Sequence, residues 1–329
     1  MNNRPEAKYI KRFAALLLIL AILTAVLVGC SCSGSKEGSP SESSSAESQA
    51  IDNTIEWKGK RYKYNSDLTN IMFLGIDRSD PITDPDVPGE AGQADCIMIL
   101  SLDGSTKEGR MLQINRNTMV QLDVYEANGA GSHKQQGQIT LQYAYSTGGS
   151  SSCWAMKKTL STFLYGLEID GYFALNFEGL AEINDAIGGV EVTMKDDYTY
   201  IDPDFKEGET VLLLGKKAER FVRYRDTEVF NSVQGRMERQ VEYVAALTGQ
   251  MKAKSGSKLY DILSPYLDKD VITDLDAETI NALKNYTYLM DEVQYLPGVM
   301  KEGEKYEEFY VDDEALQELI FEMFYVEVN

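Results

Sequence analysis

Strand-like and helix-like segments alternate through most of this chain. Short apolar runs at residues 71–74, 171–176 and 190–194 have the length and composition of buried strands. Between the last two, residues 177–187 carry apolar side chains at helical spacing and are followed by two glycines. Such alternation is typical of a partly parallel sheet with helices on both faces. The sequence therefore predicts an α/β fold, a three-layer α-β-α domain with a central mixed sheet.

Other segments fit the same architecture. Two strand-like runs, 97–102 and 111–114, flank an Asp-Gly turn and predict a hairpin. A Pro-Gly pair at 297–298 marks a turn before the last helix. The remaining predicted helices span residues 152–165, 216–224, 233–251 and 313–324. The chain shows no internal repeat and no second linker, so we expect one folded domain over residues 66–329.

The N-terminal end has a different composition. Residues 1–12 are basic, and the apolar run 13–28 leads to Gly29 and Cys30. As a helix of about 1.5 Å per residue, the apolar run spans roughly 25 Å, slightly less than the ~30 Å hydrocarbon core of a bilayer. The segment 13–30 therefore fits an uncleaved signal anchor or a lipoprotein signal that ends at a lipidated Cys30. Both alternatives place the domain at the extracytoplasmic face of the bacterial cytoplasmic membrane.

The anchor segment is followed by a polar stretch, residues 31–65. Its first half is rich in Ser, Gly and Glu, and the tract 39–48 contains only Ser, Pro, Glu and Ala. Such a composition cannot bury enough apolar surface to fold. We expect this stretch to be a flexible tether between the membrane and the domain.

Composition excludes several classes of function. The formal net charge is −20, whereas a nucleic-acid partner requires a basic face. The single histidine, His133, lies in a polar stretch that is predicted to be a loop, which argues against His-based triads and multi-His metal sites. Cys96, expected to be a buried apolar residue, and Cys153 have no disulfide-framework spacing. Walker A, protein-kinase and Gly-x-Ser-x-Gly motifs are absent, so a nucleoside triphosphate is not indicated.

A group of basic and amide side chains stands out in this acidic chain. Arg223 and Arg225 lie at the end of one predicted helix, and Arg236 and Gln240 share one face of the next. Guanidinium groups bind phosphate oxygens bidentately and carry a charge that does not titrate. The group predicts a phosphate or pyrophosphate site, although each arginine alone could also form a surface salt bridge.

Two aspartates, Asp77 and Asp95, each lie beside the end of a predicted strand. Carboxylates brought together from neighbouring strands suit a hard cation such as Mg²⁺, with Mn²⁺ as the alternative, which retains waters and shares phosphate oxygens. Taken singly, each aspartate could be an ordinary solvated or capping residue. Combined with the arginines, the pair predicts phosphoryl-transfer chemistry, because cations neutralise charge on the transferring and leaving phosphates.

The order of motifs resembles that of the LytR–CpsA–Psr (LCP) family of bacterial envelope proteins. The matching stretches cover about residues 70–251. They are Asn70–Asp77, Gln93–Asp95, Asn115–Thr118, Gln142–Tyr145, Leu175–Gly179, Asp185–Val190, Val222–Arg225 and Gly235–Gln240.

The resemblance implies a membrane-anchored, Mg²⁺-dependent phosphotransferase. Its donor would be an anionic glycopolymer, of teichoic acid or capsule type, on a polyprenyl-pyrophosphate carrier. Its acceptor would be a muramic-acid hydroxyl of peptidoglycan, and a phosphodiester would form. It implies Asp77 and Asp95 as metal ligands, with Asp77 also a candidate to help deprotonate the hydroxyl. The pyrophosphate clamp that it implies consists of Arg116, Arg223, Arg225, Arg236 and Gln240. The catalytic residues that it implies are Asp77 together with Arg116, Arg223 and Arg225.

The resemblance also implies an apolar tunnel for the polyprenyl tail between sheet and helices. The side chains in the corresponding segment are Phe173, Leu175, Phe177, Leu180 and Ile183, which ordinary core packing explains equally well.

The chain departs from the family pattern at two positions. Asn117 stands where the family often has Asp, so a carboxylate is lost, and Ala94 stands where Arg or Ser is common. These changes bear on how the acceptor hydroxyl is activated and on which polymer is handled. Two alternatives therefore stay open: a non-catalytic polyprenyl-glycan binding protein and a polyprenyl-pyrophosphate hydrolase.

Overall fold

The computed structural model describes residues 54–83, 87–126, 131–253 and 258–328. A seven-stranded sheet forms the centre of this part, with strand order β11-β8-β3-β4-β5-β12 and β13 also paired to β5. These strands are β3 (Leu68–Ile76), β4 (Ala94–Asp103), β5 (Glu108–Gln113), β8 (Gly171–Asn176), β11 (Val271–Thr273), β12 (Thr287–Tyr288) and β13 (Gln294–Tyr295). β3 runs parallel to β8, and β5 runs parallel to β12 and β13, whereas the other pairs are antiparallel. The predicted central mixed sheet is confirmed.

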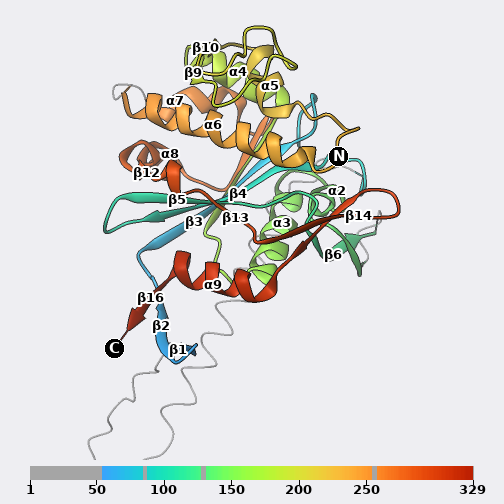
Figure 1. Cartoon of the computed structure of the whole chain (residues 1–329), viewed down its shortest axis with the longest axis vertical. Coiled ribbons are helices and arrows are strands. Elements are labelled where there is room, and N and C mark those ends of the chain that lie inside the picture. The colour runs from blue at the N-terminus through green and yellow to red at the C-terminus, as the bar shows by residue number, and fades with distance from the viewer. Residues whose placement is uncertain (1–53, 84–86, 127–130, 254–257, 329) are drawn as a thin grey trace, which may run out of the picture. The chain divides into compact units, whose positions relative to one another are not determined.

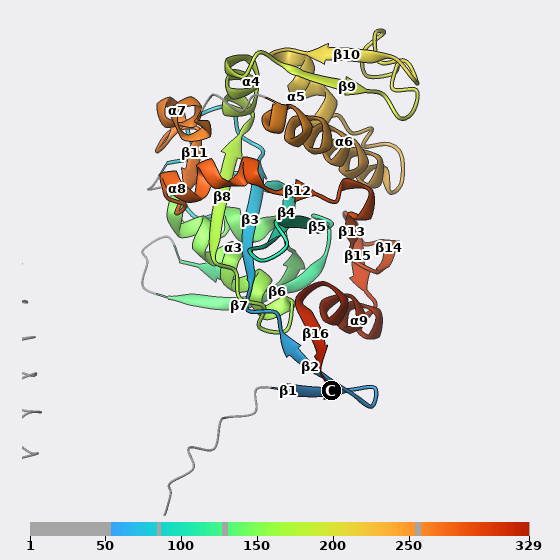
Figure 2. The ribbon, with the colours of Figure 1, turned by 90° about the vertical axis from the view of Figure 1, so that its left-hand side faces the viewer.

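Helices cover both faces of this sheet (Figures 1 and 2). On one side lie α2 (Leu141–Ala144), α3 (Gly149–Phe163) and α9 (Asp313–Phe324). On the other lie α4 (Phe177–Ala186), α5 (Lys216–Arg223), α6 (Ser232–Ala253), α7 (Leu259–Leu263) and α8 (Ala277–Ala282). Short 3₁₀ turns occur at η1 (Ser264–Tyr266), η2 (Leu283–Asn285) and η3 (Met290–Glu292). This arrangement is the three-layer α-β-α architecture that the alternating pattern predicts.

Strand β3 contributes side chains to two hydrophobic cores, one on each face of the sheet. Because side chains alternate across a strand, Met72 and Leu74 face one layer of helices, and Ile71 and Phe73 face the other. The first two belong to the core formed with α3 and α9. The second two pack with Leu100 and residues near α8. A strand buried on both faces reads as an unbroken apolar run, which is why this segment is recognisable from sequence.

Smaller sheets surround the central one. Their strands are β1 (Thr54–Trp57), β2 (Lys60–Tyr64), β16 (Tyr325–Val328), β6 (Met119–Tyr125), β7 (Ser132–Gln138), β9 (Val190–Thr193), β10 (Thr210–Leu213), β14 (Gly298–Glu302) and β15 (Glu307–Val311). β2 lies between β1 and β16, and the other six form the pairs β6–β7, β9–β10 and β14–β15.

Two predictions are wrong at these strands. The tether predicted for 31–65 ends earlier, because residues 54–64 form β1 and β2. The Trp57 ring stacks on Phe321 of α9 and the Tyr62 ring contacts it at a tilt, with centroids 4.7 and 4.8 Å away, so aromatic contacts hold this polar segment on the domain. His133 lies in β7 opposite Val124 and not in a loop. Five successive residues of β7 are exposed, so the strand lacks the apolar alternation that sequence analysis relies on.

The helix predictions are confirmed within a few residues. α9 begins at Asp313 after Asp312, whose side chain accepts from the backbone N–H of Ala315. α4 is capped in the same way by Asn176. Cys96 and Cys153 form no disulfide with another described residue. The predicted membrane segment 13–30, Cys30 and the tether up to residue 53 lie outside the described residues. Among the helices that are described, none combines the length and apolarity needed to cross a membrane.

The β14–β15 hairpin depends on a close approach at Gly298. A Cβ at this position would lie 2.3 Å from the carbonyl oxygen of Tyr310, a distance that real Cβ atoms do not reach. We expect Gly298→Ala to lower the free energy of unfolding by about 1–3 kcal/mol, because backbone must shift to admit the methyl group. Urea unfolding measures this. The control is Gly249→Ala on α6, where an added Cβ has nothing within 4 Å and should stabilise the domain. A Gly298→Ala protein with an unchanged free energy of unfolding would contradict the packing argument.

Candidate active site

The two predicted metal-ligand aspartates lie on adjacent strands. Asp77 directly follows β3, and Asp95 is the second residue of β4, its antiparallel neighbour. The register shifts after Gly75, and the N–H of Asp77 then donates to the carbonyl of Gln93 at 2.9 Å. The β3–β4 pair therefore brings both carboxylates to the same end of two neighbouring strands, as the sequence predicts.

Asp95 lies between two of the predicted arginines. Its Oδ1 is 2.8 Å from Nε of Arg116, and its Oδ2 is 2.6 Å from Nη1 of Arg236. The three side chains are largely buried, with exposed fractions of 15%, 12% and 4% respectively. Burial lowers the pKa of Arg116, and the charge of Asp95 acts in the opposite direction. These arginines are therefore held at the site by one shared carboxylate.

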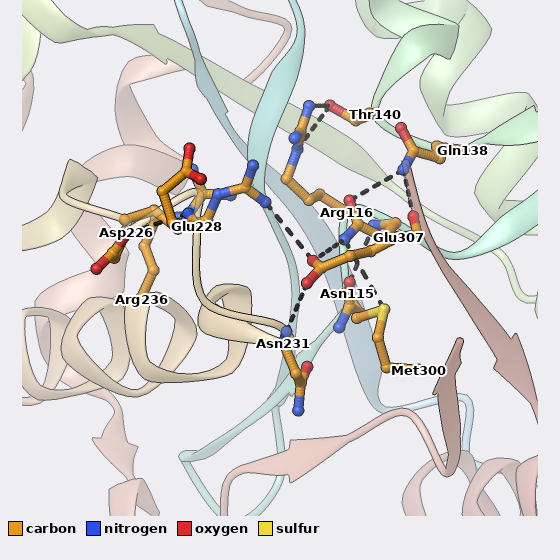
Figure 3. Close-up of polar contacts among 12 residues, drawn as sticks. Asn115, Arg116, Gln138, Thr140, Asp226, Glu228, Asn231, Arg236, Met300 and Glu307 are labelled. Atoms are coloured by element: carbon orange, nitrogen blue, oxygen red, sulfur yellow. Dashed lines mark hydrogen bonds and ion pairs between the residues drawn. The ribbon is translucent and has the colours of Figure 1, made fainter. Parts of the chain in front are cut away.

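Further contacts fix Arg116. This residue follows β5, and its guanidinium donates to Oγ1 of Thr140 at 3.0 Å and to Oε1 of Gln93. Figure 3 shows the bond from Arg116 to Thr140. A guanidinium with three such partners loses little further freedom when it binds an anion.

Arg223 and Arg225 lie next to the same cluster but face two different cavities. Arg223, the last residue of α5, is 2.9 Å from Glu219 and lies over the ring of Phe177, 4.2 Å from its centroid. Arg225 approaches Glu307 of β15, with Nη1 and Oε2 3.9 Å apart. The helix ends between the two arginines, and the extended backbone of Tyr224 separates them.

Two residues of α6 hold this segment in place. Arg239, which lies off the predicted face, donates to the backbone carbonyls of Phe221 and Tyr224. Gln240 donates to the carbonyl of Val222 at 3.2 Å and accepts from Gln113 at 3.0 Å. The amide of Gln240 is thus already bonded at both ends. The structure supports a positioning role for Gln240, and its predicted contact with pyrophosphate stays a prediction.

An apolar cavity of about 270 Å³ leads to the arginine cluster. It lies between the central sheet and the helices α4, α6, α7 and α8. Its walls include all five side chains predicted for a tunnel: Phe173, Leu175, Phe177, Leu180 and Ile183. Asp95, Arg223, Arg236 and Gln240 supply polar side chains to the same lining. This shape fits a molecule with a long apolar part and an anionic head.

Arg236 carries hydrogen-bonding capacity that the protein leaves unused. Its Nε and Nη2 atoms are buried, and within the described residues they have no hydrogen-bond partner. Leaving a buried charged donor unpaired costs about 1–3 kcal/mol or more. Arg236 also belongs to the lining of the apolar cavity.

Asp77 is electrostatically unfavourable in the ligand-free domain. The residue as a whole is exposed. Partial burial of its carboxylate, and to a smaller extent the charge of Asp95, raise its pKa above the ordinary 3.8. The charges of Arg116, Arg223 and Arg236 lower that pKa but do not cancel the rise. No group of three or more potential metal ligands occurs among the described residues. A divalent cation between two carboxylates would nevertheless relieve their repulsion and take its remaining ligands from water and phosphate.

A stability measurement tests this electrostatic cost. When folding raises the pKa of a carboxyl group, the free energy of unfolding falls as pH rises from the ordinary pKa through the raised one. Above the raised pKa the loss is complete. We therefore expect Asp77→Asn to raise the melting temperature at neutral pH, with the gain disappearing as pH falls toward 3.8. Thermal melts across this pH range check the sign. A less stable variant at neutral pH would mean that the arginines outweigh the repulsion.

Sequence reasoning missed several residues of the site. Gln93 and Thr140 bind Arg116, and Glu307 approaches Arg225. Glu307 is far away in the sequence and lies in an acidic tail with many similar residues. A pattern of spacing could not have selected it, because only the fold of β15 against Asn117 brings it to the site.

Comparison with known proteins shows the family of this chain. The model of the LytR_cpsA_psr family matches residues 32–323. The chain belongs to the LytR–CpsA–Psr family. Over 220 residues it is 29% identical to the polyisoprenyl-teichoic acid–peptidoglycan teichoic acid transferase TagU of Oceanobacillus iheyensis. That alignment covers 66% of this chain and 62% of the relative, so the chain spans less than two thirds of the relative's length.

Solved structures of LCP proteins share the fold. The crystal structure of Bacillus subtilis TagV matches with a TM-score of 0.58 and 22% identity, covering 78% of this chain and 97% of that one. A structure of TagT bound to LI-WTA matches with a TM-score of 0.58 and 21% identity, covering 78% and 89%. At this level of identity the likeness establishes the three-layer fold, and the chemistry must be argued from the site.

Proposed function

We propose that this protein transfers an anionic glycopolymer, of teichoic acid or capsule type, from a polyprenyl-pyrophosphate carrier to a muramic-acid hydroxyl of peptidoglycan. The reaction joins the two polymers through a phosphodiester and releases the polyprenyl phosphate. The relative TagU is named as a transferase of teichoic acid to peptidoglycan, which supports the proposal.

One observation carries the proposal: the lining of the apolar cavity includes two arginines, and Arg236 has buried donors without a hydrogen-bond partner among the described residues. A polyprenyl tail suits the apolar walls, and a pyrophosphate suits the guanidinium groups of Arg223 and Arg236 in the same lining. A small anionic metabolite would not require the apolar cavity. A neutral lipid would not require the arginines.

The site residues then have distinct tasks. Arg236 and Arg223 bind the phosphate nearer the apolar cavity, and Arg116 and Arg225 bind the phosphate that is transferred. Guanidinium groups fixed in advance stabilise the charge of a phosphoryl-transfer transition state without reorganising. Asp77 and Asp95 would hold Mg²⁺, or Mn²⁺, which neutralises charge on the phosphate oxygens when bound.

The proposal includes a location. The basic and apolar segments of residues 1–30 would anchor the chain at the extracytoplasmic face of the cytoplasmic membrane, either as a signal anchor or through a lipidated Cys30. That face of a bacterial membrane gives access to both peptidoglycan and a polyprenyl carrier.

A product analysis tests the function. The full chain would be placed in lipid nanodiscs with a synthetic polyprenyl-pyrophosphate glycan and peptidoglycan oligomers, with and without Mg²⁺. Mass spectrometry is expected to show a metal-dependent phosphodiester adduct that is lost in Arg116→Ala. Free glycan phosphate would instead identify a pyrophosphate hydrolase. Donor binding without any product would identify a carrier-binding protein.

A further inference from the structure

A second, polar cavity lies beside the arginine cluster. Its volume is about 490 Å³, and Arg116 and Arg225 form part of its wall. The rest comes from the segment between α5 and α6, from Asn117 and Gln138, and from the β14–β15 hairpin. An anion held by Arg116 and Arg225 would therefore border this polar cavity, while the apolar cavity opens beside Arg223 and Arg236.

The lining of the polar cavity suits a sugar with free hydroxyl and amide groups. It offers amide side chains and four carboxylates, Glu228, Glu302, Glu304 and Glu307, which can accept hydrogen bonds from hydroxyl groups. It also offers two exposed aromatic rings, Phe230 at 50% and Tyr306 at 72% exposure. Its carboxylates outnumber its three cations, which disfavours a polyanionic chain.

Among the four carboxylates of the polar cavity, Glu307 is the one that approaches Arg225. Its Oε1 accepts from the backbone N–H of Asn231, which fixes the side chain. Its Oε2 has only weaker contacts, 3.3 Å to Nδ2 of Asn117 and 3.9 Å to Nη1 of Arg225. Figure 3 shows Glu307 at the meeting point of these contacts. The Oε2 atom therefore retains capacity to accept a proton beside the transferred phosphate.

Asn117 is the side-chain neighbour of this carboxylate. Its amide group donates to Oε2 of Glu307 at 3.3 Å. An aspartate at 117 would place two negative charges within hydrogen-bonding distance of each other, which Asn117 avoids by donating to Glu307. In this pair of neighbouring side chains, Glu307 therefore supplies the carboxylate and Asn117 supplies the donor.

We infer that the polar cavity binds the acceptor sugar and that Glu307 accepts the proton of the attacking hydroxyl. The inference rests on the proposed function. The hydroxyl oxygen forms a bond to the glycan-bearing phosphorus as its proton passes to Oε2 of Glu307. The bond from that phosphorus to the bridging oxygen breaks, and polyprenyl monophosphate leaves with the electron pair.

Steady-state kinetics of the full chain in nanodiscs test this assignment. We expect Glu307→Gln to lower kcat by about 10²-fold, with donor affinity unchanged. Glu308→Gln is the matched control, because Glu308 is adjacent on β15 but accepts from Tyr310 at 2.5 Å and does not line the cavity. The double variant Asn117→Asp/Glu307→Gln restores a carboxylate at 117 and should recover at least tenfold of the loss.

A binding measurement separates this inference from the proposed function. Calorimetry with a peptidoglycan disaccharide alone, without donor, should show binding that Tyr306→Ala weakens roughly tenfold. Saccharide binding without any phosphodiester product would support the cavity assignment while overturning the proposed function. A Glu307→Gln enzyme with normal kcat, or one in which only donor affinity falls, would overturn the assignment of Glu307. Saccharide binding that is indifferent to Tyr306 would overturn the assignment of the cavity.

Discussion

Replacing Arg236 by alanine should lower the rate of transfer by about 10²–10³-fold, the usual cost of removing one preorganised electrostatic donor from an active site. Arg236 is 4% exposed, lines the apolar cavity and holds two donors that the protein does not use. Its loss also weakens donor binding, because a phosphate loses a bidentate partner. Initial rates over a range of donor concentrations separate the two effects.

Two further variants make the Arg236 result specific. Arg236→Lys keeps the charge but not the fork, so it should recover only part of the rate. Arg220→Ala removes an exposed arginine of α5 that pairs with Asp202 at 2.7 Å, and should leave the rate within about twofold. Stability should change less for Arg236→Ala than for a variant at Asp95, because Asp95 keeps Arg116. An Arg236→Ala protein with full activity would contradict the phosphate-binding site.

Asp95→Asn should have the largest effect on stability, a loss of about 3–5 kcal/mol in the free energy of unfolding. The substitution leaves Arg116 and Arg236 buried without their shared carboxylate. Excess inorganic pyrophosphate should return part of the loss, because an anion that binds the native state stabilises it by mass action. Denaturant unfolding of the variant and wild type, with and without pyrophosphate, measures both quantities.

The control for Asp95 is an exposed ion pair. Asp80 is 66% exposed and pairs with Arg78, so Asp80→Asn should cost at most about 1 kcal/mol and should not respond to pyrophosphate. If Asp95→Asn were as stable as wild type, or if pyrophosphate stabilised both variants equally, the two arginines would not depend on Asp95.

The elements that sequence analysis predicts are those with a strong local pattern. β3 and β8 are buried on both faces, and α9 combines apolar spacing with an N-terminal capping residue. β7 and β2 have mostly exposed side chains, so their positions depend on backbone pairing and on contacts with distant segments. Such strands show little alternation of apolar and polar residues, and they are therefore predicted as a loop or a tether.

In the candidate site, too, short local motifs were predictable from the sequence, whereas contacts between distant residues were not. Asp77, Asp95 and the arginines lie in short motifs, and the β3–β4 pairing and the α5–α6 junction bring them together as expected. The sequence could not show that Gln240 and Arg239 hold backbone carbonyls. Nor could it show that Arg223 and Arg225 face separate cavities, because one extended residue after α5 determines their directions.

The pairing of site arginines with carboxylates has a kinetic consequence. Arg116 and Arg236 share Asp95, Arg223 pairs with Glu219, and Arg225 approaches Glu307, in a chain of net charge −20. As an anion comes within about 8 Å of the surface, the Debye length at physiological ionic strength, it therefore meets a net negative field and not unpaired arginines. Long-range attraction cannot deliver a polyanionic donor, so its capture depends on lateral diffusion in the membrane. Added salt should then speed the encounter, the reverse of the behaviour of proteins that steer anions with an open basic surface.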